Sequence, residues 1–330
     1  MIGNIDRTIP ESRRQLTMVP SSLSTEEEEE EPRAVRISEE QQVVGKSVLL
    51  GLGYYCRNKH ITICNAPPYS PCPVLVSLYA AMGLHSYNLL QGKSFKFSRV
   101  LEYSKTYGSP AASTYRMALD AMDPCLSSVR VFETSVTEKS YGKLSLRCNF
   151  AIPLGETRKI YNIIDEIRRS REASMEYNLT GCMPEMPPLD PFQDTNRFYL
   201  LNKSEVEENE WIRMYLDLAF AATHRGTSKA PDLSKLEIVE VAVSIDTSDE
   251  EGPGPGPGLC RPTNAVFYIR HMDRSTARVE KNDVDRIAIV RRIYNPRTGC
   301  FSLIGQILSS QTIPKPIMDD NPSLTVATIL

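Results

Sequence analysis

The sequences Gly142-Lys143-Leu144-Ser145-Leu146 and Gly299-Cys300-Phe301-Ser302-Leu303 decide the fold, because each closes the last hairpin of a similar stretch of chain. In both, the glycine follows a polar turn, and apolar residues then alternate with small or polar ones. Residues 73–152 and 207–307 share the order of one helix followed by four strands. We interpret these stretches as degenerate copies of one unit, so that an internal repeat sets the architecture.

The first copy begins with a helix at Pro73, a residue that suits the first helical position. Gly92 ends this helix, whose apolar face is formed by Leu75, Leu78, Tyr79 and Met82. Runs of alternating apolar residues then predict four antiparallel strands at residues 94–103, 113–122, 129–137 and 143–152.

The second helix begins at Ser204-Glu205-Val206-Glu207, which we interpret as a capping box. Arg225 followed by Gly226 is a fitting helix end. The expected buried stripe of this helix is Ile212, Tyr215, Leu216, Ala219 and Thr223. Strands are predicted at residues 236–245, 265–271, 286–294 and 300–308.

A helix followed by an antiparallel meander predicts the α+β class rather than alternating α/β. The expected organisation is an acidic disordered tail at 1–40, a first unit at 41–153, a helical and Pro-rich linker at 154–193, a second unit at 194–309 and a loose tail at 310–330. The first tail contains the glutamate run Glu26–Glu31, which repels itself and buries nothing.

Composition and charge exclude several function classes. The apolar fraction of 41% is enough for packed cores, and the net charge of −3 favours neither nucleic acid nor an anionic membrane as a partner. No run approaches the roughly 18 apolar residues of a membrane span, and residues 1–20 are too polar for a signal peptide. We therefore expect a cytoplasmic or nuclear protein whose eight cysteines are free thiols.

Five segments resemble a plant family, Uncharacterised Protein Family 0725 of the cystatin/monellin-like superfamily. The resemblance covers roughly residues 45–308 and is carried by Tyr87–Gly92, Ala121–Pro124, Asp194–Tyr199, Glu208–Leu216 and Leu233–Leu236. It implies a cystatin-like fold in which one helix is cradled by a curved antiparallel sheet. The expected architecture is thus two tandem cystatin-like units, each a helix packed on a four-stranded antiparallel sheet. The resemblance implies no catalytic residue.

Cystatin-type inhibitors of papain-like proteases use a Gln-x-Val-x-Gly hairpin loop and a later Pro-Trp pair. The chain contains Gln41-Gln42-Val43-Val44-Gly45, but this match precedes the first predicted helix. The only tryptophan, Trp211, follows Glu210 inside a predicted helix. Because fold alone does not fix function, cysteine-protease inhibition is kept as the alternative hypothesis.

Other motifs fit their usual sites poorly. Val48–Gly53 begins like a dinucleotide fingerprint but has no βαβ context. The spacing of Cys56, His60, Cys64 and Cys72 differs from that of zinc sites, and the remaining histidines His85, His224 and His271 have no recognisable nucleophile. Arg291 and Arg292 should point to opposite faces of a strand, which breaks the basic patch that they could form with Arg286.

The sequence therefore predicts no catalytic, cofactor-binding or metal-binding residue and no cofactor. The favoured hypothesis is a non-catalytic plant protein that acts through an unknown protein partner. A small-molecule-binding or enzymatic cone-shaped pocket is the further alternative.

Overall fold

The computed structural model describes residues 61–64, 71–107, 113–154, 183–225, 231–245, 264–274, 285–295 and 300–309, which lie within one compact unit, Lys46–Leu330. The predicted tails at 1–40 and 310–330 and residues 155–182 of the predicted linker at 154–193 lie outside these residues. We call residues 61–154 the first half and residues 183–309 the second half.

The first half contains one long helix and a meander of long strands. Its elements are β1 Ile61–Ile63, α1 Val74–Gln91, β2 Lys96–Tyr107, β3 Ser113–Asp123, β4 Ser128–Glu138 and β5 Leu144–Pro153. Pro73 is the N-cap of α1 rather than its first residue, and Gly92 ends the helix in the left-handed conformation, with φ 58°. The four long strands follow the predicted ones closely, while β1 is additional.

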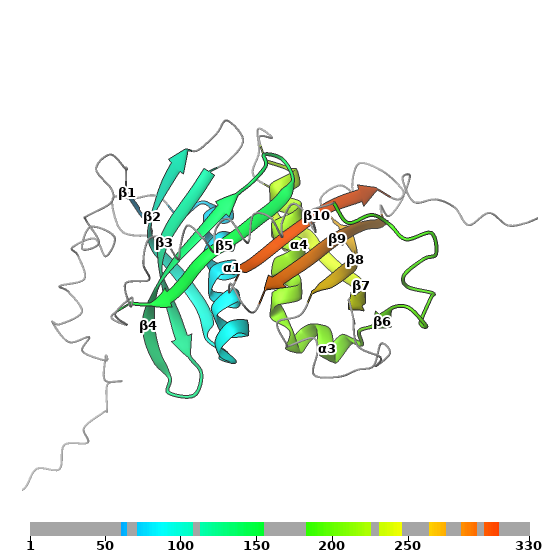
Figure 1. Cartoon of the computed structure of the whole chain (residues 1–330), viewed down its shortest axis with the longest axis horizontal. Helices are drawn as coiled ribbons and strands as arrows, with labels where there is room; N and C mark the ends of the chain where they lie inside the picture. Colours follow the sequence, from blue (N-terminus) through cyan, green and yellow to red (C-terminus); the bar gives the residue numbers. More distant parts are fainter. Residues whose placement is uncertain are drawn as a thin grey trace, which may run out of the picture. The chain divides into compact units, whose positions relative to one another are not determined.

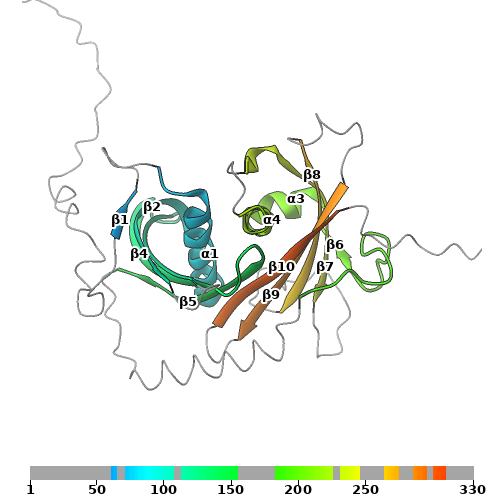
Figure 2. The same cartoon turned by 90° about the horizontal axis from the view of Figure 1, so that it is seen from above.

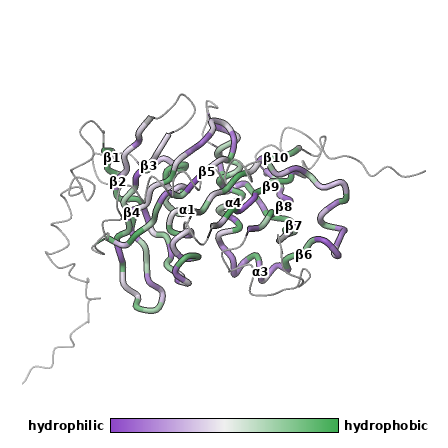
Figure 3. Tube along the Cα trace, in the orientation of Figure 1, coloured by the Kyte–Doolittle hydropathy of each residue, from purple (hydrophilic) through white to green (hydrophobic). Residues whose placement is uncertain are grey.

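The second half repeats this order with a broken helix. Its elements are β6 Tyr199–Leu200, α3 Lys203–Glu208, α4 Glu210–Thr223, the 3₁₀ turn η2 Leu233–Lys235, β7 Leu236–Ile245, β8 Ala265–Asp273, β9 Asp285–Asn295 and β10 Cys300–Ser309. The α3 helix buries no residue, and its chain is largely hydrophilic (Figure 3).

The predicted capping box at Ser204–Glu207 is wrong by two residues. Asn202 is the N-cap of α3: its side chain accepts from the Glu205 amide at 2.9 Å, and Glu205 accepts from the Asn202 amide at 2.8 Å. Ser204 instead donates its hydroxyl to Asn202. Asparagine is at least as good a cap as serine, so the earlier start uses both residues.

The two halves share a single sheet, which corrects the prediction of two separate four-stranded sheets. The ten strands are ordered β1-β2-β3-β4-β5-β10-β9-β8-β7-β6, and every neighbouring pair is antiparallel (Figure 1). The last strands of the two copies meet at the centre, where Leu303 lies opposite Leu146. This pairing hides two edges that would otherwise expose unpaired backbone groups. The molecule is therefore α+β, with a large antiparallel sheet and few helices.

The main apolar core lies between the helices and the concave faces of the sheet. Figure 2 shows α1 within the curve of β2–β5 and α4 against β7–β10. The core is continuous from Tyr79 and Met82 of α1 to Tyr215 and Leu216 of α4, all of them completely buried. The predicted stripe of the second helix is confirmed except for Thr223, which is exposed.

A second, smaller core covers the opposite face of the sheet in the second half. Phe192 and Phe198, which precede β6, pack there against Tyr268 of β8 and Ile289 of β9. Arg270 stacks on Phe192 at 4.1 Å and pairs with Asp190 at 3.4 Å, which fastens this segment to β8. The sheet of the second half is thus covered on both faces.

Candidate functional site

The first cluster of polar side chains between the halves surrounds Glu138, the last residue of β4. Arg225 follows the C-terminus of α4, and its guanidinium forms an ion pair with the Glu138 carboxylate. Tyr79 of α1 donates its hydroxyl to Glu138 Oε1 at 3.3 Å, and Arg225 Nη2 donates to the hydroxyl of Tyr115 at 3.2 Å. We call these four residues the glutamate cluster.

The glutamate cluster is largely closed to solvent, although the side chain of Arg225 is 18% exposed. Tyr79 is completely buried, and Glu138 is 3% exposed. Burial raises the pKa of the Tyr79 hydroxyl above its ordinary value, and the charge of Arg225 offsets part of that rise. Tyr79 therefore stays protonated and donates to a carboxylate that is already neutralised by Arg225. This arrangement suits a tie between α4 and the first half, because breaking a buried pair leaves an uncompensated charge.

The second cluster lies at the contact of α1 with α4. The Nε2 atom of His85 and the hydroxyl of Tyr215 share a hydrogen bond of 3.1 Å, and the His85 ring stacks on Trp211 at 5.3 Å. The guanidinium of Arg292, from β9, lies 5.3 Å from the rings of both Trp211 and Phe267. We call His85, Trp211, Tyr215 and Arg292 the histidine cluster.

The histidine cluster holds a neutral imidazole beside a permanent cation. Burial and then the charge of Arg292 lower the pKa of His85 to about 3. Burial raises the pKa of Tyr215 to about 12, against the opposing effect of Arg292. Neither group changes its charge near neutral pH. A general acid or base needs a pKa closer to the working pH, so this cluster is better suited to joining the helices.

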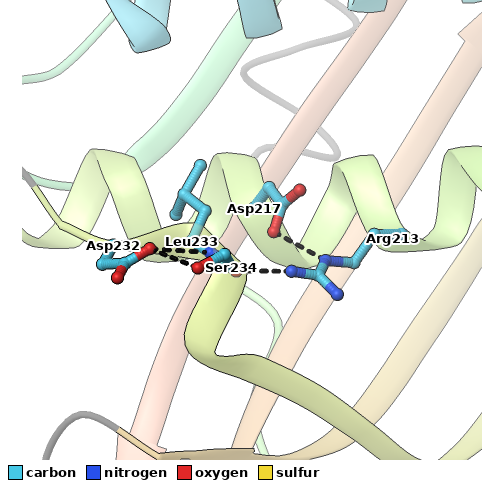
Figure 4. A network of polar contacts seen from close by, with 5 residues as sticks. All are labelled: Arg213, Asp217, Asp232, Leu233 and Ser234. Carbon is cyan, nitrogen blue, oxygen red and sulfur yellow. Dashed lines mark hydrogen bonds and ion pairs between the residues drawn. The ribbon is translucent and has the colours of Figure 1, made fainter.

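A third network fixes α4 to the turn before β7 (Figure 4). Arg213 donates from Nε to Asp217 Oδ1 at 2.9 Å and from Nη2 to the carbonyl of Leu233. Asp232 accepts from the amide and the hydroxyl of Ser234, which closes the turn. Burial raises the pKa of Asp217, while Arg213 acts in the opposite direction. The network is structural, because each charged group is engaged by its neighbour.

The tip of the β3–β4 hairpin presents apolar side chains to solvent. Met122 and Val129 are partners across the hairpin and are 46% and 59% exposed, and Leu126 in the turn is 64% exposed. The turn is pinned by Asp123, whose Oδ1 accepts from the amides of Cys125 at 2.9 Å and Leu126 at 3.3 Å. We call Met122, Leu126 and Val129 the hairpin tip. Exposed apolar groups on a fixed scaffold are typical of contact surfaces.

Comparison with known proteins gives the family. A sequence model described as Protein MS5 matches residues 183–303. UPF0725 protein At3g25080 of Arabidopsis thaliana is 42% identical over 190 residues, which are 57% of this chain and 95% of that protein. UPF0725 protein EMB2204 of the same plant is 33% identical over 255 residues, 77% of this chain and 73% of that protein. The chain belongs to the UPF0725 family.

A solved structure supports the same assignment. The crystal structure of MS5 from Brassica napus is 29% identical to this UPF0725 protein, with a TM-score of 0.55, and the match covers 74% of this chain and 100% of that one. The resemblance to the plant family that the sequence indicated is confirmed.

The residues singled out in the sequence are dispersed in the UPF0725 fold. His85 lies in the histidine cluster, His224 stacks on Phe220 at 4.0 Å after α4, and His271 is buried in β8. Arg292 is buried and Arg291 partly exposed, as their opposite faces predict. Trp211 lies inside α4. Gln41–Gly45, Val48–Gly53, Cys56 and His60 lie outside the described residues.

Among the described residues, no three of His, Cys, Asp and Glu gather as metal ligands, and no helix is both long and apolar enough to cross a membrane. Cys64 and Cys72, however, do lie together. The glutamate cluster could not be predicted from the sequence, because Glu138 and Arg225 are far apart in the chain. The sequence pattern indicates only a helix end at Arg225.

Proposed function

We propose that this UPF0725 protein is non-catalytic and acts by docking the hairpin tip into a cleft of a protein partner. The observation that carries the proposal is the exposure of Met122, Leu126 and Val129 on a turn that Asp123 holds in one conformation. Because the turn is already ordered, docking costs little conformational entropy.

The surroundings of the tip define the chemistry of the partner. Lys96 lies opposite Met122, its side chain is 64% exposed, and its Nζ atom lies 3.8 Å from the exposed carboxylate of Glu210. The exposed Arg130 stands over Phe95 at 5.8 Å. An apolar cleft bordered by carboxylates complements this arrangement. The net charge of −3 supports a protein partner rather than nucleic acid or a membrane. We propose that this partner is bound in the cytoplasm or the nucleus.

The proposal of a non-catalytic role rests on the two buried clusters. The charge of the Glu138 carboxylate is balanced by Arg225 in an ion pair, and the pKa of His85 is lowered to about 3. Side chains such as Tyr79 and Met82 fill the space between α1 and the sheet. Within the described residues, the polar groups of the two clusters bind one another. This favours a scaffold over a cone-shaped pocket that binds a small molecule or catalyses a reaction.

We also propose that the two halves are tandem cystatin-like units fused through β5 and β10. The support is their element order, in which a short strand and helical segment precede four long antiparallel strands in each half. Sharing this fold carries no activity with it.

Cysteine-protease inhibition is the alternative that a simple titration separates from docking. The turn between β4 and β5, residues 139–143, exposes Tyr141 but has no Pro-Trp pair, and Trp211 lies in α4. We expect no loss of papain activity when the protein is titrated to a large excess. Stoichiometric inhibition at nanomolar protein would replace docking by inhibition as the proposed function.

The docking proposal is tested by comparing three proteins in affinity capture from plant tissue. The wild type is matched with Leu126→Ser/Val129→Thr and with Val239→Thr, which alters a valine on β7 that is 46% exposed. We expect the wild type and the β7 control to retain the same partner, and the hairpin variant to lose it. Direct titration of the purified partner should then show at least a tenfold weaker affinity for the hairpin variant. Equal binding by all three proteins would refute the hairpin as the contact.

A further inference from the structure

Cys64 and Cys72 place two thiols side by side at the start of the first half. Cys64 follows β1, and its amide donates to the carbonyl of Leu101 on β2 at 2.8 Å. Cys72 lies next to Pro73, the N-cap of α1. Both side chains pack in the main apolar core, and their thiols share a hydrogen bond. Two sulfurs in hydrogen-bond contact need only a small movement to reach the bonding distance of a disulfide.

We propose that Cys64 and Cys72 are a redox modification site, which a peroxide or a small-molecule disulfide converts reversibly into an intramolecular disulfide. With a peroxide, the Cys72 thiol loses its proton and its sulfur attacks one oxygen, so that the O–O bond breaks and a sulfenic acid forms. The released proton converts the leaving hydroxide into one water. The Cys64 sulfur then attacks the sulfenic sulfur, the S–O bond breaks, and a second water leaves with the Cys64 proton. Two thiols and one hydrogen peroxide thus give one disulfide and two waters. With a small-molecule disulfide, Cys72 displaces one small thiol to form a mixed disulfide, and Cys64 then displaces the second small thiol.

The surroundings of the two thiols assign these roles. Cys64 is 6% exposed, whereas Cys72 is only partly buried, so a soluble oxidant meets Cys72 first. Burial and the hydrogen bond to Cys72 raise the pKa of Cys64 to about 12, so that Cys64 is protonated at neutral pH. Cys64 therefore acts second, on a sulfenic acid that has formed beside it.

The disulfide would tie β1, the outermost strand of the first half, to the start of α1. It would close a short loop, from residue 64 to residue 72. Cross-links over loops of this size lower the equilibrium constant of unfolding by roughly 30- to 100-fold, because they remove conformations from the unfolded chain. Oxidation should therefore raise the melting temperature of the full chain.

The sequence makes the product easy to detect. Lys59 and Lys93 are successive tryptic sites, so that peptide 60–93 contains both cysteines and none of the other cysteines of the chain. The full-length protein is reduced, exposed to hydrogen peroxide or oxidised glutathione, alkylated and digested. A disulfide within this peptide lowers its mass by two hydrogens and blocks both alkylations, and dithiothreitol should reverse both effects.

Single variants separate this pair from general oxidation. Cys64→Ser and Cys72→Ser should each abolish the mass loss and the rise in melting temperature. Cys125→Ser, which removes an exposed cysteine of the hairpin turn, should leave both intact. The proposal is refuted if peptide 60–93 remains fully alkylated while Cys125 becomes oxidised. It is equally refuted if Cys72 forms a stable bond to Cys56 or to glutathione instead of to Cys64.

Discussion

At the scale of single residues, Phe301 is the clearest test of the shared core. It is completely buried at the centre of the sheet and packs edge-on against the His85 ring at 5.6 Å. Phe301→Ala removes most of a buried ring from a site with rigid walls, so we expect a loss of about 3–5 kcal/mol in the free energy of unfolding. Urea denaturation of the full chain measures this loss.

The control for Phe301 cannot be its neighbour. The alternation of the hairpin predicts that Ser302 points to solvent, but it is only 2% exposed on the opposite face of the sheet. Val239→Ala on β7, where the valine is 46% exposed, is the better control and should cost less than about 0.5 kcal/mol. A loss for Phe301→Ala as small as that of the control would contradict its place in the core.

His85 should make stability depend on pH. Its pKa of about 3 in the folded protein lies below the value of about 6.5 expected when unfolded. Between these values the unfolded chain binds a proton that the folded one does not, so stability is lost as pH falls. The contribution is fully present above pH 6.5 and declines below it by up to about 1.4 kcal/mol per pH unit.

The His85→Gln variant isolates this contribution, because glutamine does not titrate but can still hydrogen bond to Tyr215. Unfolding free energies of both proteins should be measured from pH 7.5 to pH 4.5. The wild type should lose stability more steeply than the variant below pH 6.5. Asp217, whose pKa is raised, acts with the opposite sign but is present in both proteins. If the free energies of unfolding of the two proteins changed in parallel with pH, the pKa of His85 would not be lowered by folding.

At the scale of elements, Gly83 lets α1 approach β4. A Cβ atom at this position would lie 2.8 Å from Thr134 Cβ and 2.9 Å from its Cγ2. Gly83→Ala should therefore destabilise the fold by about 1–3 kcal/mol through overpacking. This cost outweighs the gain of up to about 1 kcal/mol that alanine brings inside a helix.

Thermal and urea unfolding of Gly83→Ala should be compared with Ser77→Ala in the same helix, which gains helix propensity without a clash. Adding Thr134→Ala should restore part of the lost stability, since it removes Cγ2 but leaves Cβ in place. If Gly83→Ala were as stable as the wild type, the close approach of α1 to β4 would be wrong.

Most elements could be predicted from local pattern, and the failures have local causes too. The predicted strand at residues 236–245 coincides with β7, because its apolar residues alternate and turns bound it. The sequence pattern does not predict the break between α3 and α4. Asn209 there donates its side-chain amide to the carbonyl of Glu205 and accepts from Trp211 Nε1, contacts that helical periodicity does not encode.

At the scale of the whole molecule, the repeat predicted the units but not their fusion. Leu144 and Leu146 were expected to match Phe301 and Leu303, and all four are indeed buried. The sequence of each hairpin is equally compatible with a separate sheet. The pairing of β5 with β10 depends on backbone groups that are far apart in the chain. Gly305 shows how closely the halves pack, because a Cβ there would lie 3.1 Å from Cδ2 of Leu144 in the first half. The glutamate cluster and the histidine cluster also depend on contacts between residues that are far apart in the chain.

The continuous sheet and core predict that both halves unfold together. The pairing of β5 with β10, the ion pair of Glu138 with Arg225 and the bond of His85 to Tyr215 all join them. Separating the halves would expose buried apolar surface and uncompensated polar groups, so an intermediate with one folded half should be poorly populated.

Trp211 is the only tryptophan, and its fluorescence reports on the second half and on its contact with His85 of the first half. Hydrogen exchange of peptides from β2, β3 and β4 reports on the first half. Across a urea series, the two probes should give coincident midpoints. Arg225→Leu should lower both midpoints together, because the ion pair stabilises the joined state. Exchange of the β2–β4 peptides at a urea concentration where Trp211 is still native would show instead that the halves are independent domains that merely share a sheet edge.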